Sequence, residues 1–95
     1  MINRHATITI VETLERPGKG NIVCGTDADL LDWTTDQIRG LAAGEAIVQG
    51  EHVLVLSVKV SAAMSGRRNI FLLLPETTPV ALLAPGTPMQ VFARN

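Results

Sequence analysis

The chain has 95 residues, which suits one domain spanning 1–95 and leaves no room for a two-domain enzyme with a cleft between lobes. Eight Lys and Arg residues against nine Asp and Glu give a net charge of −1, which argues against a generally basic nucleic-acid binder and against an acidic disordered tail. Hydrophobic residues reach 46% and charged residues only 18%, so we expect a globular domain with an unusually large apolar surface to cover.

Cysteine usage and hydropathy point to a protein that is neither secreted nor membrane-spanning. Cys24 is the only cysteine, so no intramolecular disulfide can form. The first residues lack the apolar core of a signal peptide, and no apolar run approaches the roughly 20 residues that span a bilayer. We expect a cytoplasmic protein, or a virion component if the chain is phage-encoded.

The N-terminal third predicts a β-hairpin. Residues 6–14 alternate β-branched and apolar side chains with period two, which is typical of a half-buried strand. Pro17 and Gly18 then favour a type II turn, because proline presets its φ and glycine accepts a positive one. Residues 21–24 are expected to return as a second short strand.

A helical segment over 27–43 is predicted next. Thr26 with Asp29 resembles a capping box, and Thr34 with Gln37 forms a second one inside the same segment. The segment is therefore expected to be one helix or two short helices that meet near the second start.

The rest of the chain predicts strands. Prolines and glycines divide it into short apolar or alternating runs. The expected order is β-β-α-β-β-β-β, an α+β domain with a mainly antiparallel sheet or small open barrel and the helical segment packed on one face or end. The predicted strands are 52–60, 69–74, 80–83 and 89–93, with a further short one at 46–49.

No motif indicates an active site, a metal or a cofactor. Residues 18–21 (Gly-Lys-Gly-Asn) lack the spacing of a phosphate-binding loop and precede a strand rather than a helix. Cys24 ends an apolar strand, which favours packing over nucleophilic chemistry, and its distance from His5 and His52 cannot be derived from the sequence. We predict that the chain is not an enzyme and binds no cofactor and no metal.

Two groups of charged residues are the candidate partner contacts. Three aspartates at helical spacing share one face, which is either a solvated surface or a contact for a basic partner. A pair of arginines at a predicted hairpin tip could contact phosphate, although the aromatic residues that would stack bases are expected in the core. The predicted contact residues are Lys19, Asp29, Asp32, Asp36, Arg67 and Arg68.

Self-association is the main functional expectation. Residues 53–56 and 70–74 are apolar on both strand faces, and one helix can cover only one face of the sheet. Closure into a barrel or a second copy of the chain would cover the other face, and we favour the second copy. Residues 1–47 carry a net −3 and residues 48–95 a net +2, a polarity that suits head-to-tail or antiparallel association.

Residues 41–53 (LAAGEAIVQGEHV) resemble a sequence pattern common in small β-rich phage capsid proteins. The resemblance implies a phage or mobile-element product and assigns no site residue. The function expected from the sequence is a non-enzymatic, self-associating protein-interaction or assembly module. Its partner is another copy of itself or another protein. The alternative is a small nucleic-acid-binding regulator that uses Arg67 and Arg68. No membrane partner is expected.

Overall fold

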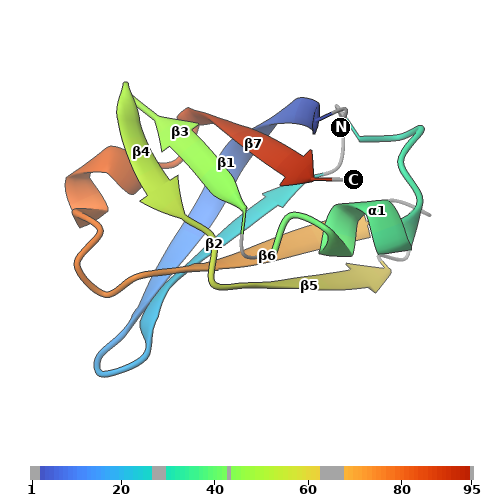
Figure 1. Cartoon of the computed structure of the whole chain (residues 1–95). Helices are drawn as coiled ribbons and strands as arrows, with labels where there is room; N and C mark the ends of the chain where they lie inside the picture. The colour runs from blue at the N-terminus through green and yellow to red at the C-terminus, as the bar shows by residue number, and fades with distance from the viewer. Residues whose placement is uncertain (1–2, 27–29, 43, 63–67, 95) are drawn as a thin grey trace.

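One antiparallel sheet makes up most of the molecule (Figure 1). The structure, a computed structural model, describes residues 3–26, 30–42, 44–62 and 68–94. Its elements are β1 (Asn3–Arg16), β2 (Gly20–Thr26), α1 (Thr35–Arg39), β3 (Glu45–Val48), β4 (Glu51–Leu54), β5 (Ser57–Ala62), β6 (Arg68–Leu74), the 3-10 helix η1 (Val80–Leu83) and β7 (Pro88–Arg94). The seven strands follow the order β4-β3-β7-β1-β2-β6-β5 in an open sheet, which confirms the predicted mainly antiparallel α+β fold.

A bend in β1 gives the sheet its shape. The first half of β1 pairs with β7, its second half pairs with β2, and the register shifts between Ile10 and Glu12. Gly25 lies opposite Ile10, and a side chain there would collide with Ile8. A bulge and a glycine are the features that let strands approach closely and turn sharply. The sheet therefore curls, and its two edge strands, β4 and β5, are joined by only two residues.

The curled sheet buries one of its own faces. Alternate residues of each strand point into the concave side, where α1 packs beside β5 at one end. The curling of the open sheet, rather than a long helix, thus covers one face of the apolar strands. The buried hydrophobic residues are Ala6, Ile8, Ile10, Val23, Leu30, Trp33, Ile38, Leu41, Ala46, Val48, Val53, Val55, Ile70, Leu72, Leu74, Leu83, Met89 and Val91.

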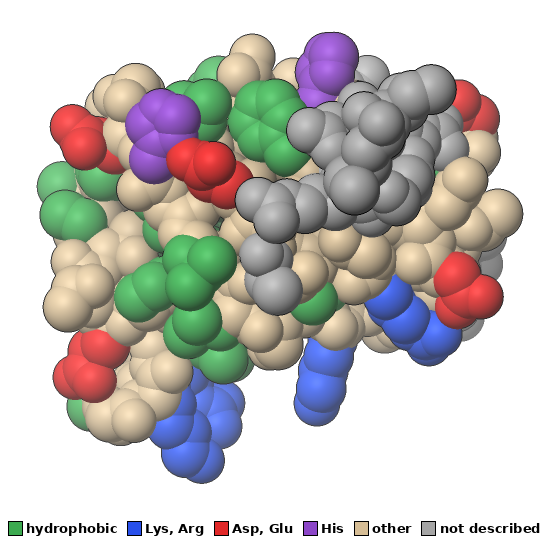
Figure 2. Space-filling view, viewed as in Figure 1, with side chains coloured by type: hydrophobic (Ala, Val, Ile, Leu, Met, Phe, Trp, Pro, Cys, Tyr) green, Lys and Arg blue, Asp and Glu red, His purple; other side chains and the backbone are tan. Residues whose placement is uncertain are grey.

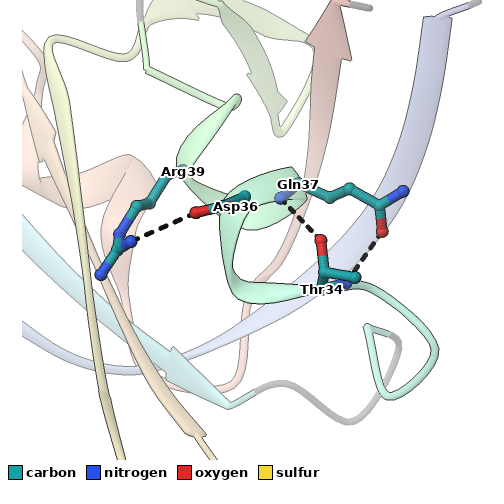
Figure 3. Close-up of polar contacts among 4 residues, drawn as sticks. All are labelled: Thr34, Asp36, Gln37 and Arg39. Carbon is teal, nitrogen blue, oxygen red and sulfur yellow. Dashed lines mark hydrogen bonds and ion pairs between the residues drawn. The ribbon is translucent and has the colours of Figure 1, made fainter.

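The helix is much shorter than the predicted 27–43 and begins at the second of the two predicted starts. Thr34 is its N-cap: the Thr34 hydroxyl accepts from the Gln37 N–H, and the Gln37 side chain accepts from the Thr34 N–H (Figure 3). The first start fails because Thr26 continues β2, and Asp29 lies outside the described residues. None of the described helices has the length and apolar character needed to cross a membrane.

Two predicted strands are also corrected. Residues 80–83 form η1 instead of a strand, because Pro79 favours a turn, in which the Leu82 N–H donates to the Pro79 carbonyl. The predicted strand 52–60 is split at residues 55–56, where the chain passes from one edge of the sheet to the other. Residues 46–49, by contrast, contribute the short strand β3.

Substituting Gly25 tests the close crossing of β1 and β2. We expect Gly25→Ala to lower the free energy of unfolding by about 2–3 kcal/mol, because the new methyl group overlaps Ile8 in a packed core. Urea denaturation followed by circular dichroism measures the change. Gly18→Ala is the matched control: Gly18 has a φ of +79° and no neighbour within 4 Å of an added Cβ, so only a backbone cost of about 1 kcal/mol applies. Equal losses in the two variants would contradict a steric role for Gly25.

Candidate functional site

The convex face of the sheet retains apolar side chains that the curling leaves uncovered. The register places Leu14, Ile22 and Leu73 side by side on β1, β2 and β6, with Ser57 of β5 at the end of the row. Leu14 is 50% exposed, and Ile22 and Leu73 are half-buried. This row therefore presents aliphatic surface to whatever lies outside the sheet.

A second row runs parallel to the first. Glu12, Cys24, Phe71 and Lys59 lie side by side across the same four strands. Phe71 and Cys24 are half-buried, whereas Glu12 and Lys59 at the two ends are exposed. The row is thus apolar in the middle and carries opposite charges at its ends.

A groove of about 210 Å3 opens on these rows. Its floor is apolar and its rim carries three cationic side chains from the β1–β2 hairpin and β5, with no carboxylate in the lining. Figure 2 shows Lys and Arg side chains projecting from the lower side of the molecule, where Figure 1 places the hairpin and β5. This convex groove is lined by Arg16, Lys19, Ile22, Ser57, Lys59, Phe71 and Leu73.

Among the described residues, the most exposed large hydrophobic side chain lies just before α1. Leu31 is 64% exposed and precedes Asp32, also exposed, just before α1. Asp36 on α1 is exposed as well, and its carboxylate accepts from Arg39 at 3.3 Å (Figure 3). Figure 1 shows α1 and the tip of the β1–β2 hairpin at opposite ends of the molecule. We refer to Leu31 with Asp32 and Asp36 as the Leu31 knob.

Five of the six predicted contact residues fall into three groups. Lys19 lies on the rim of the convex groove. Asp32 and Asp36 belong to the Leu31 knob, but Asp32 lies in a turn and Asp36 in α1, so they do not share one long helix face. Asp29 and Arg67 lie outside the described residues.

Arg68 is engaged within the chain. Its guanidinium donates to the carbonyls of Leu30 and Trp33, each at 2.7 Å. In a continuous helix these carbonyls would accept from Thr34 and Gln37, so Arg68 takes the place of the first helical turn. The interaction explains why the helix begins late, and it anchors residues 30–33 to the start of β6.

Sequence reasoning missed the apolar floor of the groove. It expected every aromatic residue in the core, and Trp33 is buried there, but Phe71 and Phe92 are half-buried. The signal was the unbroken apolar run 70–74: side chains alternate faces along a strand, so Phe71 and Leu73 lie on the face opposite the buried residues of β6. Arg16, on the rim of the groove, was not among the predicted contact residues.

Cys24, His5 and His52 are held by different neighbours. The His52 ring contacts the Glu45 carboxylate, and the His5 ring lies against Phe92 with centroids 6.1 Å apart. Burial, with a smaller contribution from the negative charge of Glu12, raises the pKa of the Cys24 thiol above its ordinary value, which lowers its reactivity. In the described part of the chain, no cluster of three or more His, Cys, Asp or Glu residues could hold a metal ion.

Comparison with protein-family models, with curated proteins and with solved structures finds no match to this chain. The convex groove and the Leu31 knob are therefore the features from which we infer a function.

Arg68 and Lys19 are expected to differ sharply in their effect on stability. Arg68→Ala leaves two partly buried carbonyls without their charged donor and should lower the free energy of unfolding by about 2–3 kcal/mol. Lys19→Ala removes an exposed side chain and should change it by less than about 0.5 kcal/mol. Urea denaturation of both variants makes the comparison, and an Arg68→Ala variant as stable as wild type would contradict the anchoring role.

Proposed function

We propose that this protein is a non-enzymatic assembly module that associates head to tail with copies of itself, the Leu31 knob of one copy entering the convex groove of the next. The observation that supports it is a cation-rimmed apolar groove on the convex side of β1, β2, β5 and β6, together with an exposed leucine that directly precedes Asp32. A cytoplasmic or virion location is part of the same proposal.

Size and hydrophobicity favour this contact. A cavity of about 150 Å3 lined by aliphatic and aromatic side chains accommodates a benzene-sized group, so a groove of about 210 Å3 can take one leucine side chain. Moving Leu31 from water onto Ile22, Phe71 and Leu73 would contribute on the order of 1.5–3 kcal/mol. The same contact would cover the floor of the groove.

Charge determines which surfaces can meet. Arg16, Lys19 and Lys59 surround the groove, so two grooves placed face to face would repel each other. Asp32, which directly follows Leu31, has the complementary sign, whereas Asp36 is paired with Arg39. A contact between two different surfaces is heterologous and generates a ring if the rotation closes, or a filament if it does not. The proposal is therefore a repeating contact rather than a symmetric dimer.

Single-stranded nucleic acid is the second candidate occupant of the groove. Phe71 lies among Arg16, Lys19 and Lys59, and an aromatic side chain within a cationic groove is the usual arrangement for stacking a base beside its phosphates. It ranks second because Phe71 is half-buried and is the only aromatic residue in the lining.

The test is the concentration dependence of sedimentation. Wild-type protein should associate over a series from about 10 μM to about 1 mM, the range expected for a small contact. Leu31→Ser should weaken the association at least about tenfold, because the buried leucine supplies more than 1.4 kcal/mol. Leu54→Ser is the matched control, since Leu54 is 51% exposed and lies outside both the groove lining and the knob.

A wild-type protein that sediments as a monomer throughout the series would refute the proposal, as would equal weakening by the two variants. The nucleic-acid candidate is tested in parallel with a fluorescent single-stranded oligonucleotide. Binding that weakens with salt and is lost in a Lys19→Glu, Lys59→Glu double variant would favour that candidate.

A further inference from the structure

The turn between β3 and β4 fixes which backbone groups of β4 face away from β3. Residues 49 and 50 have φ values of +49° and +80°, as in a two-residue type I′ hairpin. Val48 and Glu51, which flank the turn, therefore form a hydrogen-bonded pair, and such pairs alternate along an antiparallel ladder. The N–H and C=O groups of His52 and Leu54 consequently point toward the open edge of the sheet.

The next residues of the chain show the same alternation. The Val55 N–H donates to the Gly44 carbonyl at 3.0 Å, on the β3 side. The Leu56 N–H points the other way and donates to the Leu73 carbonyl of β6 at 2.8 Å. The N–H and C=O groups of His52 and Leu54 thus point to the same side as the backbone groups with which β5 pairs to β6. β6 itself ends just before Pro75, which has no N–H to offer.

A hollow of about 470 Å3 lies along β4, in line with the end of β6. The segment that follows β6 forms its other wall but does not pair with β4: in the described chain, the backbone bonds of this segment run from Thr78 to Pro75 and from Leu82 to Pro79. The hollow is lined by Glu51, His52, Val53, Leu54, Pro75, Thr77, Thr78, Pro79, Ala81 and Leu82.

Carboxylates are the prevailing charged groups around the hollow. Glu51 and His52 belong to its lining, and Glu45 on the neighbouring strand contacts the His52 ring, which is cationic only when protonated. No Lys or Arg is among the lining residues. Val53 and Leu82 supply apolar surface beside the open edge.

We propose that this hollow binds an extended, cationic peptide, which adds to β4 as a strand in line with β6. The backbone groups of His52 and Leu54 would pair with the peptide main chain, as in other cases of strand addition to an open edge. Peptide side chains on one face of the added strand would lie beside Val53 and Leu82, and the intervening cationic ones would lie on the other face, near Glu45. This site is separate from the convex groove and does not depend on the head-to-tail contact.

The probe is a capped hexapeptide of alternating lysine and valine, titrated into the full-length protein by calorimetry. We expect saturable binding, at least about tenfold weaker for the same peptide N-methylated at alternate residues, because methylation removes the main-chain donors that would pair with the His52 and Leu54 carbonyls. Amide hydrogen exchange supplies a second readout: the His52 and Leu54 N–H groups should become protected when the peptide is bound. Unsaturable binding, or saturation without protection of these two amides, would overturn the proposal.

Two substitutions at one position separate backbone from side-chain effects. Leu54→Pro removes the outward N–H without removing a hydrogen bond of the chain's own sheet, and should weaken peptide binding about fivefold or more. Leu54→Ala keeps that N–H and should bind within about threefold of wild type. Equal weakening in both variants would overturn the main-chain pairing. Protection of the His52 and Leu54 amides that rises with protein concentration, without peptide, would instead identify a second copy as the occupant and overturn the peptide proposal.

Discussion

The close crossing of β1 and β2 at Gly25 is the constraint on which the rest of the molecule depends. Because no side chain separates the two strands there, β1 can bend at Ile10 and pair with β7 before the bend and with β2 after it. The bend curls a seven-stranded sheet until its two edge strands are joined by residues 55–56. One sheet then supplies both walls of its own core, which is how a 95-residue chain with a five-residue helix buries its aliphatic residues.

The curling also determines which surfaces are left for partners. The convex side of β1, β2, β6 and β5 keeps the second set of alternating side chains, and the cationic hairpin and β5 border it. β6 ends at Leu74, and β4 extends past that end with no described strand on its outer side. The outward main-chain groups of β4 therefore face a hollow. The groove thus lies on the uncovered convex face of the sheet, and the hollow lies along the exposed edge of β4. Neither surface requires a catalytic group.

Much of the local structure could be predicted from the sequence. The hairpin turn at Pro17 and Gly18, the capping box at Thr34 and most strands are encoded by short-range signals that need no tertiary partner. The helix length could not be predicted, because the group that replaces its first turn is the guanidinium of Arg68, more than thirty positions away. Nor could η1 be distinguished from a strand, since periodicity alone does not separate a short apolar run of one kind from the other.

The candidate site shows the same limit. The sequence indicated excess apolar strand surface and a polarity between the two halves of the chain, but the groove combines Arg16 and Lys19 of the first half with Lys59 of the second. Only the strand register brings these cations around Phe71.

Mixing two complementary variants tests the head-to-tail contact most directly. Leu31→Ser retains an intact groove, and the Lys19→Glu, Lys59→Glu double variant retains an intact knob. Each should sediment as a monomer alone, and an equimolar mixture should form a two-chain complex that grows no further, because only one knob and groove can still meet. A mixture that stays monomeric at concentrations where wild type associates, or variants that associate alone as wild type does, would contradict the contact.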